Sequence, residues 1–410
     1  MKRLLTLTPR EEALTRLKKM LPDHAIATEM ISTQQGLSRV LAEEVTAQHP
    51  LPQFARSTRD GYAVRAADTV GASESLPAYL HVVGELFMGK PPEIQIKPGE
   101  AALIHTGGAL PHGADAVVMI ERTQEASPQE IEVLKSVAAG ENVIPVGEDV
   151  QTGDRVLQAG CRLRIQEIGG LMALGITEIC VAKKPRAALI STGDELVPPE
   201  TLPGINQVRD INSATIGALI ETHGGIPLPQ GIIHDDAEAL YEKAAQALDR
   251  ADMLIITAGS SISARDMTAA VIDRLGKPGV LVHGIPLKPG KPTILAVCNG
   301  KPVFGLPGNP VSALNTAQLF VVPIVWQLQG TKPKRAGYIR ARLTENLPVS
   351  QGRELFATVS LEEREDGIWA TPIFGESNLI FTLVRGEGIV HVPLGATGLP
   401  QGSEVEVTLL

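Results

Sequence analysis

Three loops of this 410-residue chain place hydroxyls, carboxylates and small residues directly after short apolar runs. The first loop, "STGDELVPPE", puts Asp194 and Glu195 side by side. The spacing from Thr192 to Glu195 fits a helix capping box, but Pro198 and Pro199 forbid a helix immediately afterwards. We therefore interpret the two carboxylates as functional groups in a loop at the end of a strand, rather than as a solvated turn.

The second and third loops offer hydrogen-bond donors. In "ITAGSSISARDMT", Asp266 precedes a helix, where it fits both an N-cap and a ligand, and the residues leave both roles open. In "GLPGNPVSALNTAQLF", Asn309 is a suitable N-cap and Pro310 suits the first helical position. A helix start of this kind presents free backbone N–H groups that bind anions, and Asn309 and Ser312 would add side-chain hydrogen bonds.

A fourth motif, "LKPGKP", supplies positive charge. Pro289 and Gly290 favour a type II turn, which would bring the Cα atoms of Lys288 and Lys291 within about 7 Å. Two ammonium groups that close repel each other unless an anion lies between them; a surface hairpin with solvated lysines is the alternative. Together, the four motifs predict a phosphate-ester ligand and Mg²⁺-assisted chemistry, because Mg²⁺ takes one or two carboxylates beside phosphate oxygens.

The elements that must position these loops alternate between strand and helix. Apolar runs such as "KPRAALIST", "IPLPQGIIH" and "DMLIITAG" alternate with helical segments, one of which is predicted to be capped by Asn212 and stopped by Gly224. This order predicts a largely parallel, doubly wound α/β sheet with its ligands at the carboxyl ends of the strands. A helix is predicted near Pro9, and the regions before residue 144 and after residue 332 have mainly β-type patterns.

Composition excludes several classes of protein. The net charge of −9 and the aromatic content of 3% argue against nucleic-acid and anionic-membrane binding. Glu11 and Glu12 arrive before any long apolar stretch, which argues against a signal peptide, and no run reaches the roughly 18 apolar residues of a membrane span. Cys161, Cys180 and Cys298 lack ligand spacing, which is typical of reduced packing cysteines. We expect a soluble cytoplasmic protein.

Six motifs, in order, carry a family resemblance: "STRDGYAVR", "HTGGALPHGADAVVMIE", "GENVIPVGED", "KPRAALISTGDEL", "LKPGKP" and "GLPGNPVSAL". The chain resembles the molybdopterin molybdenumtransferase family, which comprises MoeA proteins and the E domain of gephyrin. The resemblance implies an elongated homodimer in which an α/β domain of one subunit faces the "DGYAV" region of the other. The implied fold is multidomain α/β plus β, divided into a discontinuous N-terminal domain (1–50 and 145–184), a β-rich domain (51–144), an α/β molybdopterin-binding domain (185–331) and a C-terminal β-barrel (332–410).

The resemblance also implies a reaction and its site. Adenylated molybdopterin receives molybdate or tungstate and releases AMP with Mg²⁺, and an upstream adenylating protein would be a transient partner. The implied catalytic residues are Asp60, Asp149, Glu195 and Asp266, with Glu195 and Asp266 on the metal. The expected pterin-binding residues are Thr192, Gly193, Asp194, Gly259, Ser260, Ser261, Gly308, Asn309 and Ser312, and the expected oxyanion residues are Lys288, Lys291 and Arg385.

Several segments depart from the family pattern. "AGSSISARD" stands where the family writes a GGVSVG-type loop, Arg59 replaces a usual Met, and Thr358 stands where an arginine often follows a "GREEF"-like segment. Our hypothesis is that Arg385 in "TLVRGEG" replaces that arginine in oxyanion binding; a solvated Arg385 on a hairpin is the alternative. The departures also leave open a non-catalytic or tungsten-specific molybdopterin-binding paralogue, and a scaffold protein as a third class.

Overall fold

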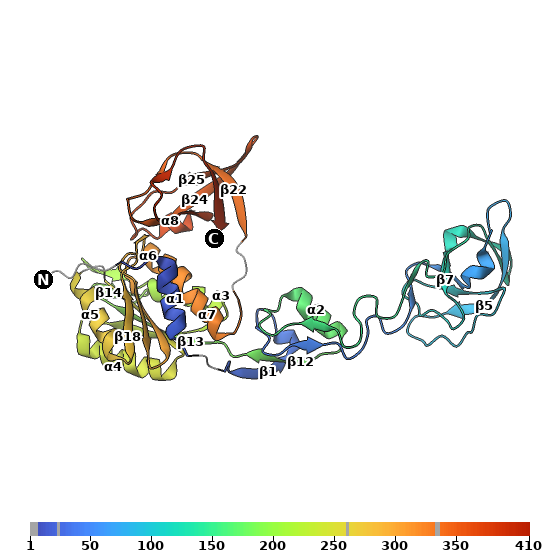
Figure 1. The fold of residues 1–410 in the computed structure, drawn as a ribbon, viewed down its shortest axis with the longest axis horizontal. Coiled ribbons are helices and arrows are strands. Elements are labelled where there is room, and N and C mark those ends of the chain that lie inside the picture. The colour runs from blue at the N-terminus through green and yellow to red at the C-terminus, as the bar shows by residue number, and fades with distance from the viewer. Residues whose placement is uncertain (1–6, 23–24, 260–261, 333–336) are drawn as a thin grey trace. The chain divides into compact units, whose positions relative to one another are not determined.

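The computed structural model of the chain (Figure 1) describes residues 7–22, 25–259, 262–332 and 337–410. The chain divides into two compact units. One unit comprises Met1–Met30, Ser38–Ala42 and Cys180–Leu410, and the other comprises Ile31–Leu37 and Glu43–Ile179.

The smaller unit is built on a six-stranded sheet with the order β7-β4-β6-β5-β9-β8. These strands are β4 (Gly61–Val64), β5 (Ala78–Leu86), β6 (Glu100–Ile104), β7 (Ala116–Met119), β8 (Thr123–Ser127) and β9 (Glu130–Val133). Neighbouring residues such as Ala63 and Val64 are both fully buried but lie in different hydrophobic clusters, so the sheet is covered on both faces. The β-type runs predicted for this region are confirmed. The unit also contains β2 (Val45–Thr46), β3 (Arg56–Ser57), β10 (Val143–Ile144), β11 (Arg155–Leu157) and helix α2 (Ile165–Ala173), and β1 (Thr28–Ser32) pairs with β12 (Glu178–Ala182).

The larger unit contains the predicted α/β sheet, with the order β16-β13-β17-β21-β20-β18. Strands β13 (Arg186–Thr192), β16 (Ile226–Ile233), β17 (Met253–Ala258) and β21 (Lys301–Pro307) are parallel. Strands β18 (Pro278–His283) and β20 (Ile294–Cys298) complete the sheet as antiparallel neighbours. The prediction of a largely parallel sheet is therefore confirmed.

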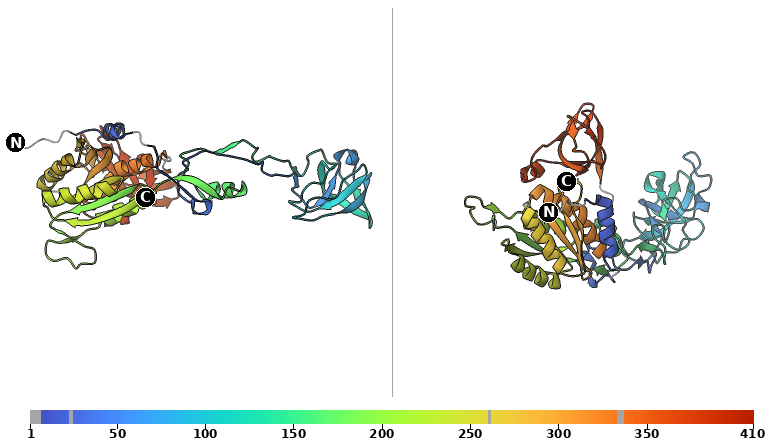
Figure 2. Two further views of the ribbon diagram at one scale, coloured as in Figure 1. Left: turned by 90° about the horizontal axis from the view of Figure 1, so that it is seen from below. Right: turned by 60° about the vertical axis from the view of Figure 1, so that its left-hand side comes forward.

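Helices cover both faces of this sheet (Figure 2). Ala187 and Leu189 of β13 pack with α1 (Arg10–Met20), α3 (Asn212–Thr222) and a long helical stretch near residue 320. That stretch consists of α6 (Pro310–Thr316), a π-helical turn (Ala317–Val321) and α7 (Val322–Leu328). Ala188 and Ile190 pack with α4 (Ala237–Arg250) and α5 (Ile262–Arg274) on the opposite face. The alternation follows from the two-residue period of a strand. Helix α1 packs on this sheet, whereas the predicted division groups it with residues 25–50; the boundaries themselves stay predictions.

Helix ends agree only partly with the predictions. Helix α1 begins after Pro9 as predicted. Helix α3 already includes Asn212 as its first residue, and the carboxylate of Asp210 accepts the backbone N–H of Asn212, so the prediction of Asn212 as the cap is wrong. Gly224 lies just beyond α3 with φ +88°, which confirms its role as the stop. Asp266 lies inside α5, which begins at Ile262, so the N-cap interpretation of Asp266 is also wrong.

The helical stretch from Pro310 to Leu328 is long and apolar enough, by length and composition, to cross a membrane. Its Phe320, Val321 and Ile324 side chains are fully buried in the core of the α/β domain. A core helix of this kind passes the same composition test, so we assign it to the core. Cys298 of β20 is fully buried too, and burial raises the pKa of its thiol to about 11, as expected for a packing cysteine.

A closed five-stranded barrel forms the C-terminal part of the same unit. Its strands run β24-β25-β22-β28-β26, and a further β24–β26 pairing closes the ring. The bounds are β22 (Tyr338–Leu343), β24 (Glu354–Arg364), β25 (Gly367–Pro372), β26 (Gly388–Val392) and β28 (Glu404–Leu409), with β23 (Leu347–Pro348), β27 (Gly398–Leu399) and helix α8 (Phe381–Val384) between them. Strand β19 (Leu287–Lys288) of the α/β part pairs in parallel with β24. The predicted C-terminal β-barrel is confirmed.

Candidate functional site

The carboxyl ends of three central strands lie at one level. Thr192 at the end of β13 pairs with Ala258 at the end of β17, and Ala258 pairs with Pro307 at the end of β21. The loops that follow these strands are therefore neighbours in space, as the α/β pattern predicts. We call this edge of the sheet, with the loops that begin at residues 193, 259 and 308, the carboxyl edge.

Close backbone approach at the carboxyl edge requires glycine at position 308, and two further glycines lie beside the Glu195 carboxylate. A Cβ atom on Gly308 would lie 2.8 Å from the carbonyl oxygen of Ala258 and 3.2 Å from the Cα of Gly259. A Cβ on Gly193 would lie 2.6 Å from a carboxylate oxygen of Glu195, and one on Gly259 would lie 3.6 Å from the other. The Glu195 carboxylate is thus located between the ends of β13 and β17, and its side chain is exposed to solvent.

A further acid reaches this edge from the neighbouring strand. Thr192 Oγ1 donates a hydrogen bond to Asp235 Oδ1 at 3.0 Å, and the backbone N–H of Asp235 donates to Asp194 Oδ1 at 3.2 Å. Asp194 is exposed, and His234 Nδ1 lies 3.1 Å from the same oxygen. Our sequence interpretation missed Asp235. The signal was available, because "IIHDD" ends the strand next to β13, but the adjacent Asp236 reads as the cap of α4, which it is.

A chain of buried hydrogen bonds links side chains just beneath the carboxyl edge. Thr257 Oγ1 donates to Ser191 Oγ at 3.2 Å, and Ser191 Oγ donates to Asp210 Oδ2 at 2.8 Å. The side-chain nitrogen Nδ2 of Asn212 donates a hydrogen bond to the carbonyl oxygen of Gly308 at 2.7 Å. The side-chain oxygen Oδ1 of Asn212 is buried and has no hydrogen-bond partner among the described residues. An unsatisfied buried acceptor beside Gly308 suits a ligand or a water that donates a hydrogen bond.

Asp266 and His283 interact electrostatically. Strand β18 ends at His283, and Asp266 is exposed on α5. Burial lowers the pKa of the His283 imidazole; the charge of Asp266 opposes this shift, and that of Arg265 adds to it. The charge of Asp266 therefore acts on a group at the end of β18. Ser260 and Ser261, predicted in the preceding loop, lie outside the described residues.

The lysine turn after β19 is anchored to α6. Lys288 is exposed and Lys291 is half-buried. Asn315 Nδ2 donates to the carbonyl of Pro289 at 2.9 Å, and Gly290 has φ +121°, a region that favours glycine. The Lys288–Pro289 bond is cis, which the turn prediction did not include. The spacing of the two ammonium groups stays a prediction.

Glu354 ties this turn to the barrel and to α1. Its Oε1 accepts hydrogen bonds from Arg10 Nε at 2.9 Å and from His391 Nε2 at 2.7 Å, and the Glu354 side chain is 7% exposed. Burial alone would raise the pKa of Glu354, but the two hydrogen bonds outweigh it and hold the pKa below its usual value. Glu354 pairs with Leu287 across β19 and β24, so this network fixes the strand that ends in Lys288.

The start of α6 is less open than predicted. Asn309 is at the N-cap position and Pro310 is the first helical residue, as expected. However, Asn309 Nδ2 donates to Ser377 Oγ at 2.9 Å, and the backbone N–H of Val311 donates to the carbonyl of Ser377 at 3.1 Å. The prediction that these N–H groups are free is therefore wrong for Val311. Ser312 is buried in the first turn.

Arg385 lies beside Thr358, the residue that stands where the family often has an arginine. It is exposed and is the C-cap of α8, so it does not lie on the hairpin that the solvated alternative assumed. A Cβ on the adjacent Gly386 would lie 2.1 Å from the methyl group of Thr358, which places the two segments in direct contact. Whether Arg385 binds an oxyanion stays a prediction.

The two remaining predicted acids belong to the other unit. Asp60 precedes β4, and its Oδ1 accepts hydrogen bonds from the backbone N–H of Thr106 at 2.8 Å and from Thr106 Oγ1 at 3.2 Å. The backbone hydrogen bond is the main cause that lowers the pKa of Asp60, which keeps this exposed carboxylate ionised. Asp149 is exposed as well. The catalytic roles of both residues stay predictions.

The acids at the carboxyl edge fit a magnesium ion held partly by its substrate. Among the described residues, no group of three or more His, Cys, Asp or Glu side chains is arranged to hold a metal. Mg²⁺ needs only one or two carboxylates where phosphate oxygens complete its shell, and Glu195 and Asp266 are exposed, with no ion pair to either carboxylate in the part of the chain that the structure describes. This donor set suits Mg²⁺ together with a phosphate ligand, not a metal caged by protein alone.

Comparisons with known proteins agree along nearly the whole chain. Family models match at residues 8–175 (MoeA N-terminal region, domains I and II), 188–327 (probable molybdopterin binding domain) and 340–410 (MoeA C-terminal region, domain IV). A molybdopterin molybdenumtransferase of Bacillus subtilis is 32% identical over 93% of this chain and 90% of its own length. A putative molybdopterin biosynthesis protein of Methanocaldococcus jannaschii is 34% identical over 92% and 90%.

Solved structures of MoeA proteins are also similar to this chain. A molybdopterin biosynthesis MoeA protein from Pyrococcus horikoshii is 31% identical, with a TM-score of 0.86 over 99% of this chain and 100% of that chain. A second structure of a MoeA protein from that organism is 37% identical, with a TM-score of 0.82 over 98% and 99%. The order of the domains, the sheet and the closing barrel all agree with this likeness. The chain belongs to the MoeA family of molybdopterin molybdenumtransferases.

Proposed function

We propose that this protein inserts molybdate into adenylated molybdopterin, with release of AMP and with a requirement for Mg²⁺. Its family supports the coarser statement, a transferase of molybdenum cofactor biosynthesis. The observation that carries the finer proposal is the carboxyl edge itself. There, Glu195 lies between two glycine-bearing strand ends, and the lysine turn is anchored to the helix that follows the third.

The residues of this edge suit separate parts of the substrate. Gly193, Gly259 and Gly308 let the phosphate-bearing part of the ligand approach the backbone. Glu195 and Asp266 would hold Mg²⁺, which supplies positive charge to the phosphate that is cleaved. Lys288 and Lys291 would hold the oxyanion by charge-assisted hydrogen bonds and keep it near the dithiolene.

The experiment supplies adenylated molybdopterin, Mg²⁺ and either molybdate or tungstate to the full chain, and measures AMP release. We expect AMP release that depends on both the oxyanion and Mg²⁺. Binding of adenylated molybdopterin without oxyanion-dependent AMP release would overturn the proposal and favour the non-catalytic paralogue. Release with tungstate alone would assign the tungsten-specific alternative.

We also propose a homodimer whose site combines residues of two subunits. The support is that Asp60 and Asp149 belong to one compact unit, whereas Glu195 and Asp266 belong to the other. Inactive Asp60→Asn and Asp266→Asn proteins, mixed and allowed to exchange subunits, should recover about a quarter of wild-type turnover, because about half of the dimers are mixed and each holds one intact site. Each variant mixed with itself is the control. Sedimentation as an active monomer would contradict the shared site.

The same reaction suggests where and with whom the protein works. Cys161, Cys180 and Cys298 form no disulfide bond within the part of the chain that the structure describes, and this agrees with a reducing, cytoplasmic location. Adenylated molybdopterin must come from an adenylating reaction, so transient contact with the enzyme that carries it out would protect the intermediate. A pull-down with that enzyme, compared with and without its product bound, tests this contact; equal absence of binding in both states would contradict it.

A further inference from the structure

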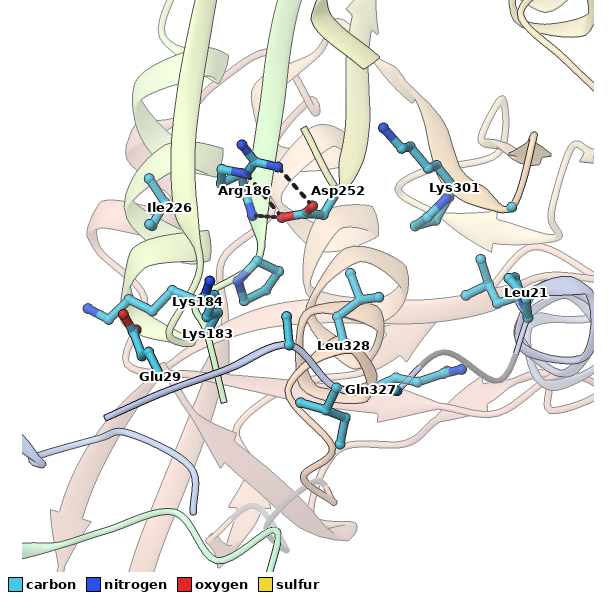
Figure 3. A pocket seen from close by; sticks show the side chains of 17 residues that line it. Leu21, Glu29, Lys183, Lys184, Arg186, Ile226, Asp252, Lys301, Gln327 and Leu328 are labelled. Atoms are coloured by element: carbon cyan, nitrogen blue, oxygen red, sulfur yellow. Dashed lines mark hydrogen bonds and ion pairs between the residues drawn. The ribbon is translucent and has the colours of Figure 1, made fainter. Parts of the chain in front are cut away.

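A second site candidate lies at the other edge of the same α/β sheet. A cavity of about 870 Å³ is lined there by the first residues of β13, β16 and β21, which are Arg186, Ile226 and Lys301 (Figure 3). Asp252, directly before β17, also lines it. Parallel strands that end at the carboxyl edge must begin at the opposite one, so this cavity is separate from the site described above. We call it the amino-edge cavity.

Much of the amino-edge cavity is apolar. Leu21, which follows α1, and Leu328, the last residue of α7, lie on one side, and Ile226 lies across from them (Figure 3). Ile26 lines the cavity too, and both isoleucines are about 40% exposed, although their side chains would gain from burial. The volume lies within the range of about 300–1,000 Å³ that small-molecule sites share, and the apolar part of the lining suits an apolar body of ring size.

The acids that line the cavity are already paired. Arg186 Nη2 lies 3.3 Å from Asp252 Oδ1, and the backbone N–H of Arg186 donates to the same carboxylate at 2.7 Å. The other acid, Glu29, accepts a hydrogen bond from Arg39 at 2.5 Å. Neither carboxylate is therefore a strong competitor for the remaining cations of the cavity.

Two of those cations have no side-chain partner among the described residues. Lys301 Nζ donates to the carbonyl of Leu248 at 2.6 Å, so its ammonium group is already bound. The side chains of Lys183 and Lys184 are exposed, line the cavity, and make no hydrogen bond or ion pair with the part of the chain that the structure describes. Two exposed lysine side chains at the border of a largely apolar cavity favour a ligand with a negative charge.

We propose that the amino-edge cavity binds a small organic anion with an apolar, ring-sized body, whose acidic group lies against Lys183 and Lys184. Each step rests on the lining residues and their partners, all of which belong to one compact unit. The site uses no residue of the carboxyl edge. The proposed transferase reaction and this binding site can therefore fail independently.

The experiment uses a pair of fluorescent probes with the same aromatic body. 8-Anilinonaphthalene-1-sulfonate carries a sulfonate, and N-phenyl-1-naphthylamine lacks it. We expect the full wild-type chain to bind the sulfonate saturably and more tightly than the neutral probe. In Lys183→Gln/Lys184→Gln, the dissociation constant of the sulfonate should rise by about five- to tenfold, while that of the neutral probe stays unchanged.

Two further variants make the test specific. Lys97→Gln/Lys135→Gln removes two exposed lysines of the other unit, with the same change in net charge, and should leave sulfonate binding as in the wild type. Ile226→Glu places an acid in the apolar lining and should weaken both probes without disturbing the core, because Ile226 is 40% exposed. Equal affinity of the wild type for both probes, or sulfonate binding by Lys183→Gln/Lys184→Gln that matches the wild type, would overturn the proposal.

Discussion

The two edges of the α/β sheet are built from different kinds of residue. At the carboxyl edge, loops rich in glycine and carboxylates follow the strands, and each loop is contiguous in the sequence. At the amino edge, the cavity is lined by residues taken from the beginnings of several strands and from the ends of α1 and α7. The carboxyl edge therefore appears in the sequence as motifs, whereas the amino edge becomes visible only when the chain is folded.

We propose phosphate chemistry for the carboxyl edge, and removal of the acids at this edge is the strongest test of that proposal. Glu195→Gln and Asp266→Asn should each lower AMP release by about 100-fold or more, because loss of a residue that only supports a metal ligand already costs about 10- to 100-fold, while adenylated molybdopterin still binds. Because Asp266 lies inside α5 and not at its N-cap, a lost cap cannot explain such a result. Rates of AMP release and equilibrium binding of the substrate are the two measurements.

The control for this prediction is Asp249→Asn, which neutralises an exposed acid at the far end of α4 from the carboxyl edge. Its turnover should equal that of the wild type. Near-normal AMP release by Asp266→Asn would remove that residue from the site and leave Glu195 as its only predicted metal ligand.

The barrel adjoins the carboxyl edge, because β19 pairs with β24 and both Asn309 and Val311 donate hydrogen bonds to Ser377. Arg385→Ala should raise the molybdate concentration for half-maximal turnover by about tenfold or more, if a charge-assisted hydrogen bond of about 1.5–3 kcal/mol is lost. Affinity for adenylated molybdopterin should hardly change. Arg340→Ala, which removes an exposed cation from β22 of the same barrel, is the matched control. An unchanged molybdate requirement in Arg385→Ala would leave oxyanion binding to the two lysines.

The smallest expected effect concerns the support of the carboxyl edge by Glu354. The folded-state pKa of Glu354 lies below its value in the unfolded chain, so its contribution to the free energy of unfolding is complete above about pH 4.3 and is lost as the pH falls through the folded-state value. Glu354→Gln should lower this free energy by about 1–2 kcal/mol at neutral pH, since its partners Arg10 and His391 are partly exposed.

Denaturant unfolding followed from neutral pH down to about pH 3 measures this difference. The gap between the wild type and Glu354→Gln should narrow at the acid end. Glu362→Gln changes an exposed glutamate of the same strand and should show no such gap. A constant gap at every pH would show that the hydrogen bonds to Glu354 do not depend on its charge.

The fold was largely predictable, because apolar runs and turn residues indicate where most of its strands and helices lie. The alternation of Ala187, Ala188, Leu189 and Ile190 between two helical layers follows from an uninterrupted apolar run. The parts of the site that lie within one contiguous loop, such as Gly193 to Glu195, could be predicted from the sequence motif of that loop. The site was not predictable where partners come from distant segments. Asp235 was missed because its carboxylate bonds to Thr192, 43 positions away in the chain.

Errors arose where two structural roles fit the same local pattern. Asp266 and Asn212 both read as N-caps, but each helix begins earlier than its apolar residues suggest, and Asp210 provides the cap hydrogen bond to Asn212 from outside α3. The N–H group of Val311 was expected to be free because nothing near it in the sequence indicates Ser377 as an acceptor. A contact between distant segments, such as that of Val311 with Ser377, does not change the pattern of apolar residues in either segment.

The packing of α1 has a consequence for synthesis on the ribosome. Helix α1 emerges well before the strands that it covers, because β18 and β20 follow only after residue 277. The smaller unit, which ends at Ile179, can complete its own core before either strand exists. Until then, the buried face of α1, with Ala13 and Leu17, has no surface to cover and must be kept from aggregation in the nascent chain. Helix α1 thus reaches its place only long after it is made.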